Sequence, residues 1–220
     1  MEVTSLNIGK RKQIQVGDDV RETGIYKESS SSSVKINQQG CIGDVVADPR
    51  GHGGPDQAVY LYSQEDYDWW AKRLQRELHP GTFGENITLS SFGAALLKIG
   101  DRFQINHVLL EVTFARIPCA KLGARMGDPG FVKQFVQARR PGVYARVLES
   151  GEVRLGDMVT LIPTSEGHPT AIELYDLWHT RERNLALLNK GLQAPIAERA
   201  RAAFQSWLDQ EIARKPLDMA

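Results

Sequence analysis

The feature of this sequence that most restricts its fold is a change in hydrophobic periodicity near Pro163. Before this proline, short runs of alternating apolar and polar residues are separated by turns that contain glycine, which is typical of β-strands. After it, apolar residues recur with the spacing of an α-helix. The change predicts two parts, a β-rich domain over residues 1–163 and a small helical unit over residues 164–220.

The β-rich part is expected to form one barrel or sandwich. Residues 96–105 (LLKIGDRFQI) and 153–162 (VRLGDMVTLI) share a pattern, a Gly-Asp pair followed by alternating residues, which predicts two strands that start in a similar way. Residues 143–157 predict a β-hairpin whose turn lies at residues 149–151. Because alternation places one side of each strand in a core, these strands are expected to share it.

Two helices are expected to interrupt the strands. Ser63 can cap a helix over residues 64–78, which Pro80 would end. Asp128 and Pro129 can open the second, because aspartate accepts unpaired amide hydrogens and proline suits the first helical position. Strands with a few inserted helices predict the α+β class.

The segment after Pro163 is predicted to contain three short helices. Thr170 and Glu173 can form a capping box at the start of the first. Gly191 can end the second, and Pro195 can begin the third. Their apolar faces need a partner, so the helices are expected to pack together, dock on the β-rich domain or form a homodimer.

The charge balance excludes a general attraction to anionic partners. The 220 residues include 27 Lys and Arg and 27 Asp and Glu, so any anion site must be local, and neither a nucleic acid polymer nor a membrane is an expected partner. The N-terminal residues lack the apolar run of a secretory signal, and no stretch approaches the roughly 18 apolar residues of a membrane span. A cytoplasmic location is therefore expected.

The two cysteines stand in different surroundings. Cys41 lies between glycines and is interpreted as a small core residue. Cys119 follows a proline and is flanked by Arg116 and Lys121, and nearby cations lower the pKa of a thiol. A thiolate can be a nucleophile, a redox centre or a ligand for a soft metal. From these residues alone, Cys119 could pack at a strand end, act in a hydrolase with His52 as its base, or hold a metal.

Two glycine-bounded loops could carry functional groups. In residues 50–62 (RGHGGPDQAVYLY), His52 and Asp56 surround a Gly-Gly-Pro turn, which predicts a functional loop or, alternatively, a simple turn beside a surface histidine. In residues 81–89 (GTFGENITL), Glu85 and Asn86 can bond a polar heterocycle, or Asn86 can merely bond its own backbone.

Together, the motifs GHGGPDQAV, FGENI and IPCAKL resemble those of the MOSC family, named for the C-terminal domain of molybdenum cofactor sulfurases. The resemblance covers about residues 20–163, and the helical segment resembles the three-helix extension of the YiiM-like branch. It implies a predominantly β-barrel-like domain, a molybdopterin cofactor and a cysteine that binds molybdenum. Family members of this type reduce N-hydroxylated compounds, including hydroxylamines and N-hydroxylated nucleobases, by two electrons.

The resemblance assigns the metal-ligand role to Cys119, and the surrounding residue types suit such a cofactor. His52 is expected to deliver a proton or to contact the cofactor. Cations would bind the phosphate, backbone amides of the glycine loop would hold the anion or pterin, and the polar pair in FGENI would bond the ring. The candidate cofactor-binding residues are Arg50, His52, Gly53, Gly54, Asp56, Glu85, Asn86, Arg116 and Lys121.

The electrons are expected to come from a separate protein. Some relatives carry a fused iron–sulfur module, but two cysteines cannot build a four-cysteine cluster. The expected partners are thus an N-hydroxylated small molecule and a flavin or iron–sulfur reductase. The main alternative is a module that carries the cofactor or a sulfur species without turnover.

Overall fold

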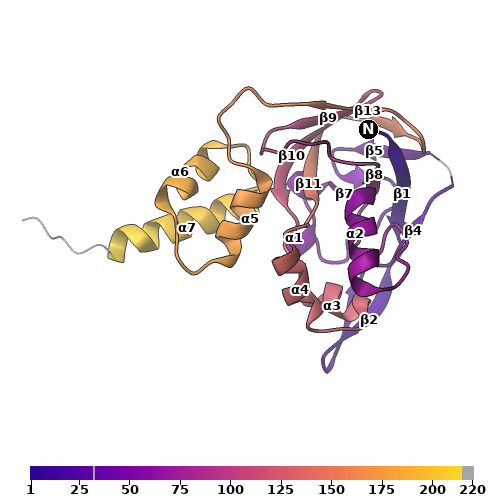
Figure 1. Cartoon of the computed structure of the whole chain (residues 1–220), viewed down its shortest axis with the longest axis horizontal. Coiled ribbons are helices and arrows are strands. Elements are labelled where there is room, and N and C mark those ends of the chain that lie inside the picture. The colour runs from indigo at the N-terminus through magenta and orange to yellow at the C-terminus, as the bar shows by residue number, and fades with distance from the viewer. Residues whose placement is uncertain (32, 215–220) are drawn as a thin grey trace, which may run out of the picture.

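The computed structural model describes residues 1–31 and 33–214 and has an α+β fold (Figure 1). Its centre is a mixed sheet of eight strands. In spatial order these are β13 (Val159–Ile162), β9 (Arg102–Ile105), β10 (Val108–Ala115), β11 (Val143–Glu149), β7 (Val59–Ser63), β8 (Ile87–Leu89), β1 (Val3–Gly9) and β4 (Lys27–Ser29). Strands β7 and β8 are parallel, and the other neighbours are antiparallel.

The expected β-barrel is not closed within the described residues. The sheet curls until the start of β1 meets the residues before β13, where Glu2 bridges Met158 and the Val3 amide donates to the Asp157 carbonyl at 2.9 Å (Figure 1). This bridge is isolated, and it is made by β1 and not by the edge strand β4. No continuous ladder joins the two sheet edges there, so the predicted barrel is corrected to a curved, open sheet.

Two smaller groups of strands accompany the main sheet. Strands β2 (Lys12–Val16) and β3 (Asp19–Thr23) form a hairpin, and β5 (Val34–Asn37) pairs with both β6 (Gly40–Cys41) and β12 (Gly151–Val153). The hairpin predicted over residues 143–157 is wrong, because β12 pairs with β5 and not with β11. Both edges of β11 are already occupied, by β10 and by β7. The two Gly-Asp strands, β9 and β13, are confirmed and pair with each other.

The helices among the strands are α1 (Pro49–His52), α2 (Gln64–Leu74), α3 (Ala120–Met126) and α4 (Phe131–Ala138), together with the 3-10 turn η1 (Pro55–Gln57). Ser63 caps α2 as predicted, since its hydroxyl accepts a hydrogen bond from the Asp66 amide at 3.1 Å. The helix ends earlier than the predicted residue 78, because Gln75 adopts a left-handed conformation with φ 51°. In the described part of the chain, no helix is long and apolar enough to cross a membrane.

An aromatic cluster fixes α2, α3 and α4 on the body of strands. Its buried members are Tyr60, Tyr62, Tyr67, Trp70, Phe83, Leu122, Met126, Phe131, Phe135 and Tyr144. The rings of Trp70 and Phe135 stack with their centroids 5.8 Å apart, and each such pair adds about 0.5–1.5 kcal/mol beyond its buried area. Since Leu122 and Met126 belong to α3, the cluster also holds the segment that carries Cys119.

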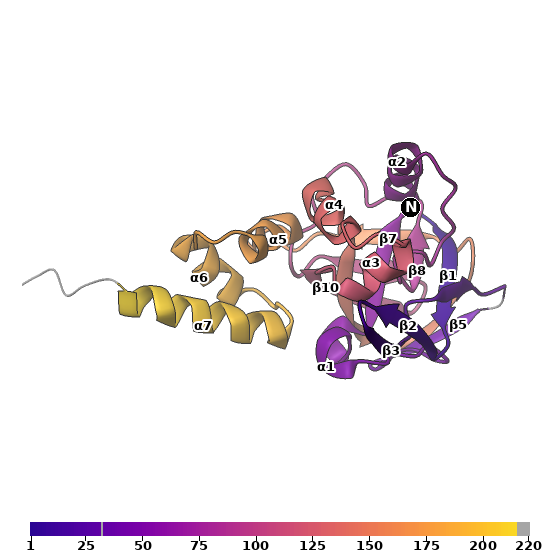
Figure 2. The ribbon, with the colours of Figure 1, turned by 90° about the horizontal axis from the view of Figure 1, so that it is seen from below.

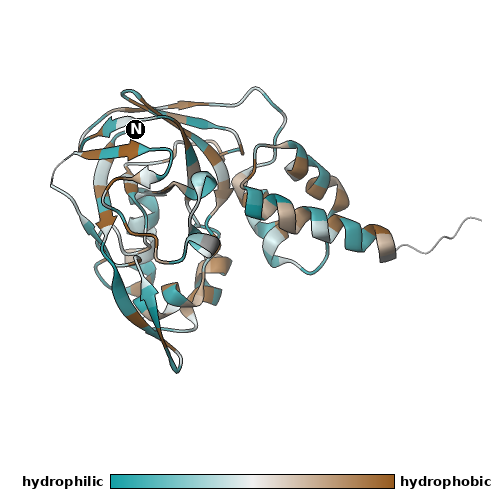
Figure 3. Cartoon of the chain, turned by 180° about the vertical axis from the view of Figure 1, so that it is seen from behind, coloured by the Kyte–Doolittle hydropathy of each residue, from teal (hydrophilic) through white to brown (hydrophobic). Residues whose placement is uncertain are grey.

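The last three helices, α5 (Ala171–His179), α6 (Leu185–Gln193) and α7 (Glu198–Arg214), lie together on one side of the strands (Figures 1 and 2). The predicted capping box of Thr170 and Glu173 is confirmed. Each helix alternates hydrophobic and hydrophilic residues along its length (Figure 3). Phe114 of β10 contacts Trp178 of α5 and Phe204 of α7, at ring distances of 5.8 and 5.9 Å. The helices therefore pack on one another and dock on the sheet.

A boundary near Pro163 stays a prediction. The buried core runs without interruption from the sheet into these helices, because residues such as Phe103, Phe114 and Phe204 belong to one hydrophobic cluster. Residues 215–220 of the predicted helical unit lie outside the described residues.

Candidate functional site

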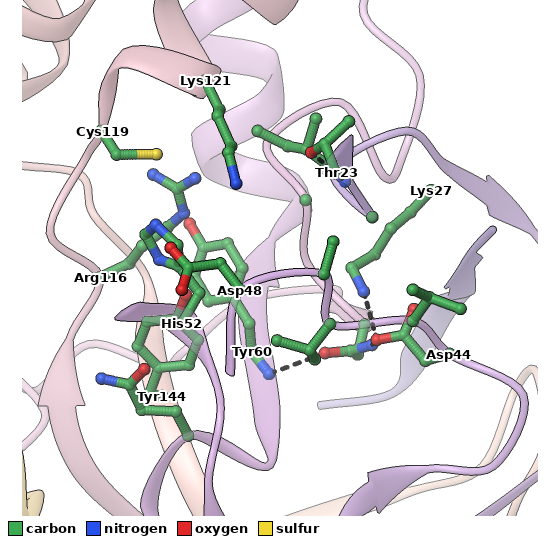
Figure 4. Close-up of a pocket in the computed structure, with 18 of the residues that line it drawn as sticks. Thr23, Lys27, Asp44, Asp48, His52, Tyr60, Arg116, Cys119, Lys121 and Tyr144 are labelled. Carbon is green, nitrogen blue, oxygen red and sulfur yellow. Dashed lines mark hydrogen bonds and ion pairs between the residues drawn. The ribbon is translucent and has the colours of Figure 1, made fainter. Parts of the chain in front are cut away.

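A pocket forms where the end of β10, the start of α3 and the loop of α1 meet. The chain leaves β10 at Ala115, and Cys119 directly precedes the first residue of α3. The pocket is lined by His52, Asn86, Arg116, Cys119 and Lys121 from the predicted site, and by Gly84 of the FGENI motif. Figure 4 shows the Cys119 sulfur near the end of the Arg116 side chain, with Lys121 beside them. The three motifs that are distant in sequence thus meet at one pocket.

Cys119 has the chemistry of a thiolate. Burial would by itself raise the pKa of this thiol, but the hydrogen bond from His52 and the positive charge of Arg116 outweigh burial and lower the pKa to about 6. Cys41 shows the opposite balance, because burial raises the pKa of its thiol to about 12. The two cysteines therefore differ in the pKa of their thiols: Cys41 is buried in the core, as interpreted from the sequence, whereas the surroundings of Cys119 favour its thiolate.

In protein without cofactor, Cys119 is expected to react with iodoacetamide at a rate that rises between about pH 5 and about pH 7 and then levels off. The reason is that the thiolate, whose pKa is lowered to about 6, dominates above that pH. Mass spectrometry of the labelled peptides measures this rate, and buried Cys41 serves as the internal control that should stay unlabelled. A rise only above about pH 8 would identify Cys119 as an ordinary thiol.

Arg116 is a buried cation with a free donor. The residue is 4% exposed, and its Nη1 atom is buried without a hydrogen-bond partner among the described residues. Its guanidinium lies over the rings of Tyr60 and Phe135, 5.4 and 5.9 Å from their centroids. Aromatic faces stabilise the charge but do not satisfy the N–H group. This arrangement suits an anionic group bound next to Cys119.

The far end of the pocket holds a buried ion pair that the sequence did not reveal. Lys27 and Asp44 form a salt bridge with both side chains 7% exposed (Figure 4). Asp44 also accepts hydrogen bonds from the Gly9 amide at 2.7 Å and from Asn86 Nδ2 at 2.9 Å. Asn86 Oδ1 accepts from the Tyr60 amide at 3.1 Å, so Asn86 lines the pocket but is held by the protein. No pattern near Lys27 or Asp44 marks either residue as functional.

The loop that carries His52 is shaped by its glycines. Asp48 caps α1 by accepting from the Gly51 amide at 3.2 Å, and a Cβ at Gly53 would come within 2.9 Å of the Pro49 Cα. Gly54 has φ 92°, a conformation that favours glycine. The side chain of Arg50, a predicted cofactor contact, lies outside the described part of the structure.

Asp56 forms its contacts outside the pocket. Its carboxylate forms an ion pair with Arg146 at 2.9 Å and accepts from the amide of Glu198, the first residue of α7, at 2.8 Å. Asp56 therefore links the His52 loop to the C-terminal helices and does not line the pocket with Cys119.

Glu85 is also placed inside the protein. The residue is fully buried, and its Oε1 atom accepts from Tyr67 Oη at 2.7 Å, Thr88 Oγ1 at 3.0 Å and the Gly81 amide. Its Oε2 atom has no partner in the part of the chain that the structure describes. Burial raises the pKa of Glu85 above its usual range, although these hydrogen bonds oppose the shift. Its predicted contact with a cofactor ring finds no support in this geometry, since Glu85 supports the loop from behind.

The variant Glu85→Gln is expected to become more stable than the natural protein as the pH rises. A carboxyl group whose pKa is higher in the folded state favours folding at pH values below its unfolded pKa, and this contribution is lost as the pH rises through the folded pKa. Glutamine keeps the accepting oxygen and cannot ionise. Denaturant unfolding across the pH range measures the difference, with exposed Glu65→Gln as the control for loss of a charge. A pH-independent difference between the natural protein and Glu85→Gln would contradict the expectation.

A model of the MOSC domain matches residues 48–160, which include His52, Asn86, Arg116 and Cys119. The chain belongs to the MOSC family. The uncharacterized protein YflK of Bacillus subtilis (strain 168) is 33% identical over 209 residues, which cover 94% of this chain and 95% of YflK. A protein named reductase from Gibberella moniliformis is 30% identical over 86% of this chain, but the match spans only 34% of that protein.

The solved structure of YiiM from Geobacillus stearothermophilus has the same fold. The TM-score is 0.78 at 25% identity, and the match covers 94% of this chain and 98% of that one. The similarity thus includes the C-terminal helices as well as the MOSC domain.

Proposed function

We propose that this protein is a molybdenum-cofactor-dependent oxidoreductase that reduces N-hydroxylated small molecules with electrons from a separate protein. The MOSC domain is associated with the molybdenum cofactor, and a relative that matches most of this chain is named reductase. The observation that carries the proposal is a Cys119 thiolate beside Arg116, whose buried Nη1 finds no hydrogen-bond partner within residues 1–31 and 33–214. A carrier or binding module without turnover is the alternative.

The residues of the pocket fit such a cofactor. A thiolate is a soft ligand suited to molybdenum, and Cys119 would be the protein ligand. Arg116 and Lys121 would bind the phosphate, because both line the same pocket and carry positive charge. In the described residues, no group of three or more His, Cys, Asp or Glu side chains is arranged to hold a metal.

The proposed reaction converts R–NH–OH, two electrons and two protons into R–NH2 and water. Bound at Cys119, the cofactor would supply the metal centre that passes the two electrons to the substrate. The N–O bond breaks, one proton goes to the nitrogen and one to the leaving hydroxyl. His52 borders the pocket beside Cys119, and we propose that its imidazole donates the proton to that oxygen.

The test is production in a host that makes molybdenum cofactor, followed by analysis of bound molybdenum and pterin. Reduction of hydroxylamine is then assayed with chemically reduced methyl viologen as the electron source. We expect about one cofactor per chain and turnover that depends on it. Retained cofactor without reduction of any N-hydroxylated probe would favour the carrier, and acylation of Cys119 in metal-free protein would favour a thiol hydrolase.

A further inference from the structure

The first residue of α7 is tied to the loop that carries His52, although the two segments are far apart in the sequence. The Glu198 amide donates to Asp56 Oδ2 at 2.8 Å. The residue before α7, Ala197, has no side-chain group that can accept a hydrogen bond. A helix N-terminus carries unpaired amides and the positive end of the helix dipole, so a carboxylate there is stabilising. Asp56 therefore supplies the cap that the local sequence of α7 lacks.

A second contact joins α7 to the same loop on the other side of His52. Arg199 donates through Nη1 to the carbonyl of Gly51, the residue before His52. The His52 amide in turn donates to the Asp48 carbonyl at 2.9 Å. Asp48, Gly51, His52 and Arg199 all line a second cavity, which also includes Cys119 in its wall. The loop is thus held by α7 both before and after His52, next to Cys119.

Asp56 is also fixed to the sheet. Its Oδ1 atom forms the ion pair with Arg146 of β11, and its backbone carbonyl accepts from Thr113 Oγ1 of β10 at 2.6 Å. Arg146 Nη2 also donates to the Pro195 carbonyl at 3.0 Å, in the segment that leads into α7. The side chains of Asp56 and Arg146 are only 24% and 25% exposed, so water and salt screen this pair less than an exposed one. Sheet, loop and α7 therefore meet at Asp56.

We propose that Asp56 and Arg199 are positioning residues, through which α7 holds the His52 imidazole beside Cys119 and the reacting oxygen of the substrate. Gly53 and Gly54 follow His52, and glycine gives a backbone more freedom, so the loop needs support from outside. Proton donation requires hydrogen-bond reach, which a displaced loop would lose. The effect on turnover rests on the proposed function, whereas the effect on the loop does not.

The test uses the full chain loaded with cofactor and the variant Asp56→Ala. In hydroxylamine reduction with reduced methyl viologen, we expect kcat per bound molybdenum to fall about tenfold while KM stays unchanged, because only the transition state loses the proton donor. In the cofactor-free chain, hydrogen–deuterium exchange of residues 48–57 should become about tenfold faster, with the rest of the chain unchanged. A general loss of stability would speed exchange throughout and would not lower kcat per bound molybdenum.

Asp176→Ala is the matched control. Asp176 of α5 pairs with Arg139 at 2.7 Å, so this variant also removes a carboxylate that joins the C-terminal helices to the rest of the protein, but away from the His52 loop. We expect it to change neither kcat nor exchange of residues 48–57. Asp56→Asn keeps an oxygen that can accept from the Glu198 amide, so it should restore most of kcat and of the loop protection.

Arg199→Ala tests the second contact and guards against misfolding of Asp56→Ala, since Arg199 is exposed. It should lower kcat per bound molybdenum about threefold and speed exchange of the same loop. If Asp56→Ala and Arg199→Ala both match Asp176→Ala, or if Asp56→Asn loses as much as Asp56→Ala, α7 does not position His52. If the natural protein reduces no N-hydroxylated probe, the proposed function fails, and loop exchange alone decides whether α7 holds the loop.

Discussion

Cys119→Ser is expected to lower the rate of reduction of N-hydroxylated substrates about a hundredfold or more, while the protein stays folded. Serine has nearly the same size, but its hydroxyl is a harder and far less acidic group than a thiol. The lowered pKa of Cys119 shows that the surroundings stabilise a negative charge there, which serine cannot supply at neutral pH. Bound molybdenum, pterin content and hydroxylamine turnover are measured on the same preparation.

Cys41→Ser is the matched control for this change. Cys41 is 7% exposed, belongs to the main hydrophobic core and does not line either cavity at Cys119. Its replacement should lower the free energy of unfolding by about 1–3 kcal/mol and leave turnover per folded molecule unchanged. Full activity in Cys119→Ser, or an equal loss in both variants, would refute Cys119 as the metal ligand.

The local patterns of the sequence predicted those features that depend on nearby residues. Ser63 and Thr170 cap helices because a hydroxyl can accept from an amide three residues later, and the structure shows both contacts. The contrast between Cys41 and Cys119 was also readable, since Arg116 lies close in sequence. These contacts can be predicted from the sequence because the interacting groups are close together along the chain.

Features that depend on distant pairing were not predictable. The sequence around β11 and β12 reads as a hairpin, but β10 and β7 occupy both edges of β11, and no local pattern reports this. The same holds for Lys27 and Asp44, which meet only because their loops are folded against one pocket. Both the strand pairing and the ion pair depend on tertiary contacts between segments that are far apart in the sequence.

Only some of the polar residues in the two glycine loops line the pocket, and the sequence did not predict which ones. Asn86 lines the pocket, whereas its neighbour Glu85 is buried and accepts hydrogen bonds from Tyr67 and Thr88. Asp56 similarly faces Arg146 and α7, while His52 on the same loop faces Cys119. The motifs predicted which loops come together, and the folded backbone determines which of their side chains line the pocket.

Asp44→Ala is expected to lower the free energy of unfolding by about 3–5 kcal/mol, because removal of one partner leaves the buried Lys27 charge without compensation. Asp44 accepts from Lys27, from the Gly9 amide and from Asn86, so the variant also leaves two neutral donors unpaired. Urea unfolding of the cofactor-free protein measures the loss. We also expect weaker retention of cofactor, since Asn86 and the pocket wall lose their anchor.

The exposed pair of Asp19 and Arg21 provides the comparison that separates burial from charge pairing. Their side chains are 66% and 51% exposed, and water screens such a pair, so Asp19→Ala should change the free energy of unfolding by less than about 1 kcal/mol. The double variant Lys27→Met with Asp44→Leu removes both buried charges and should be more stable than Asp44→Ala alone. If Asp44→Ala costs no more than Asp19→Ala, the pair is solvated in solution, and the far end of the pocket is open to water.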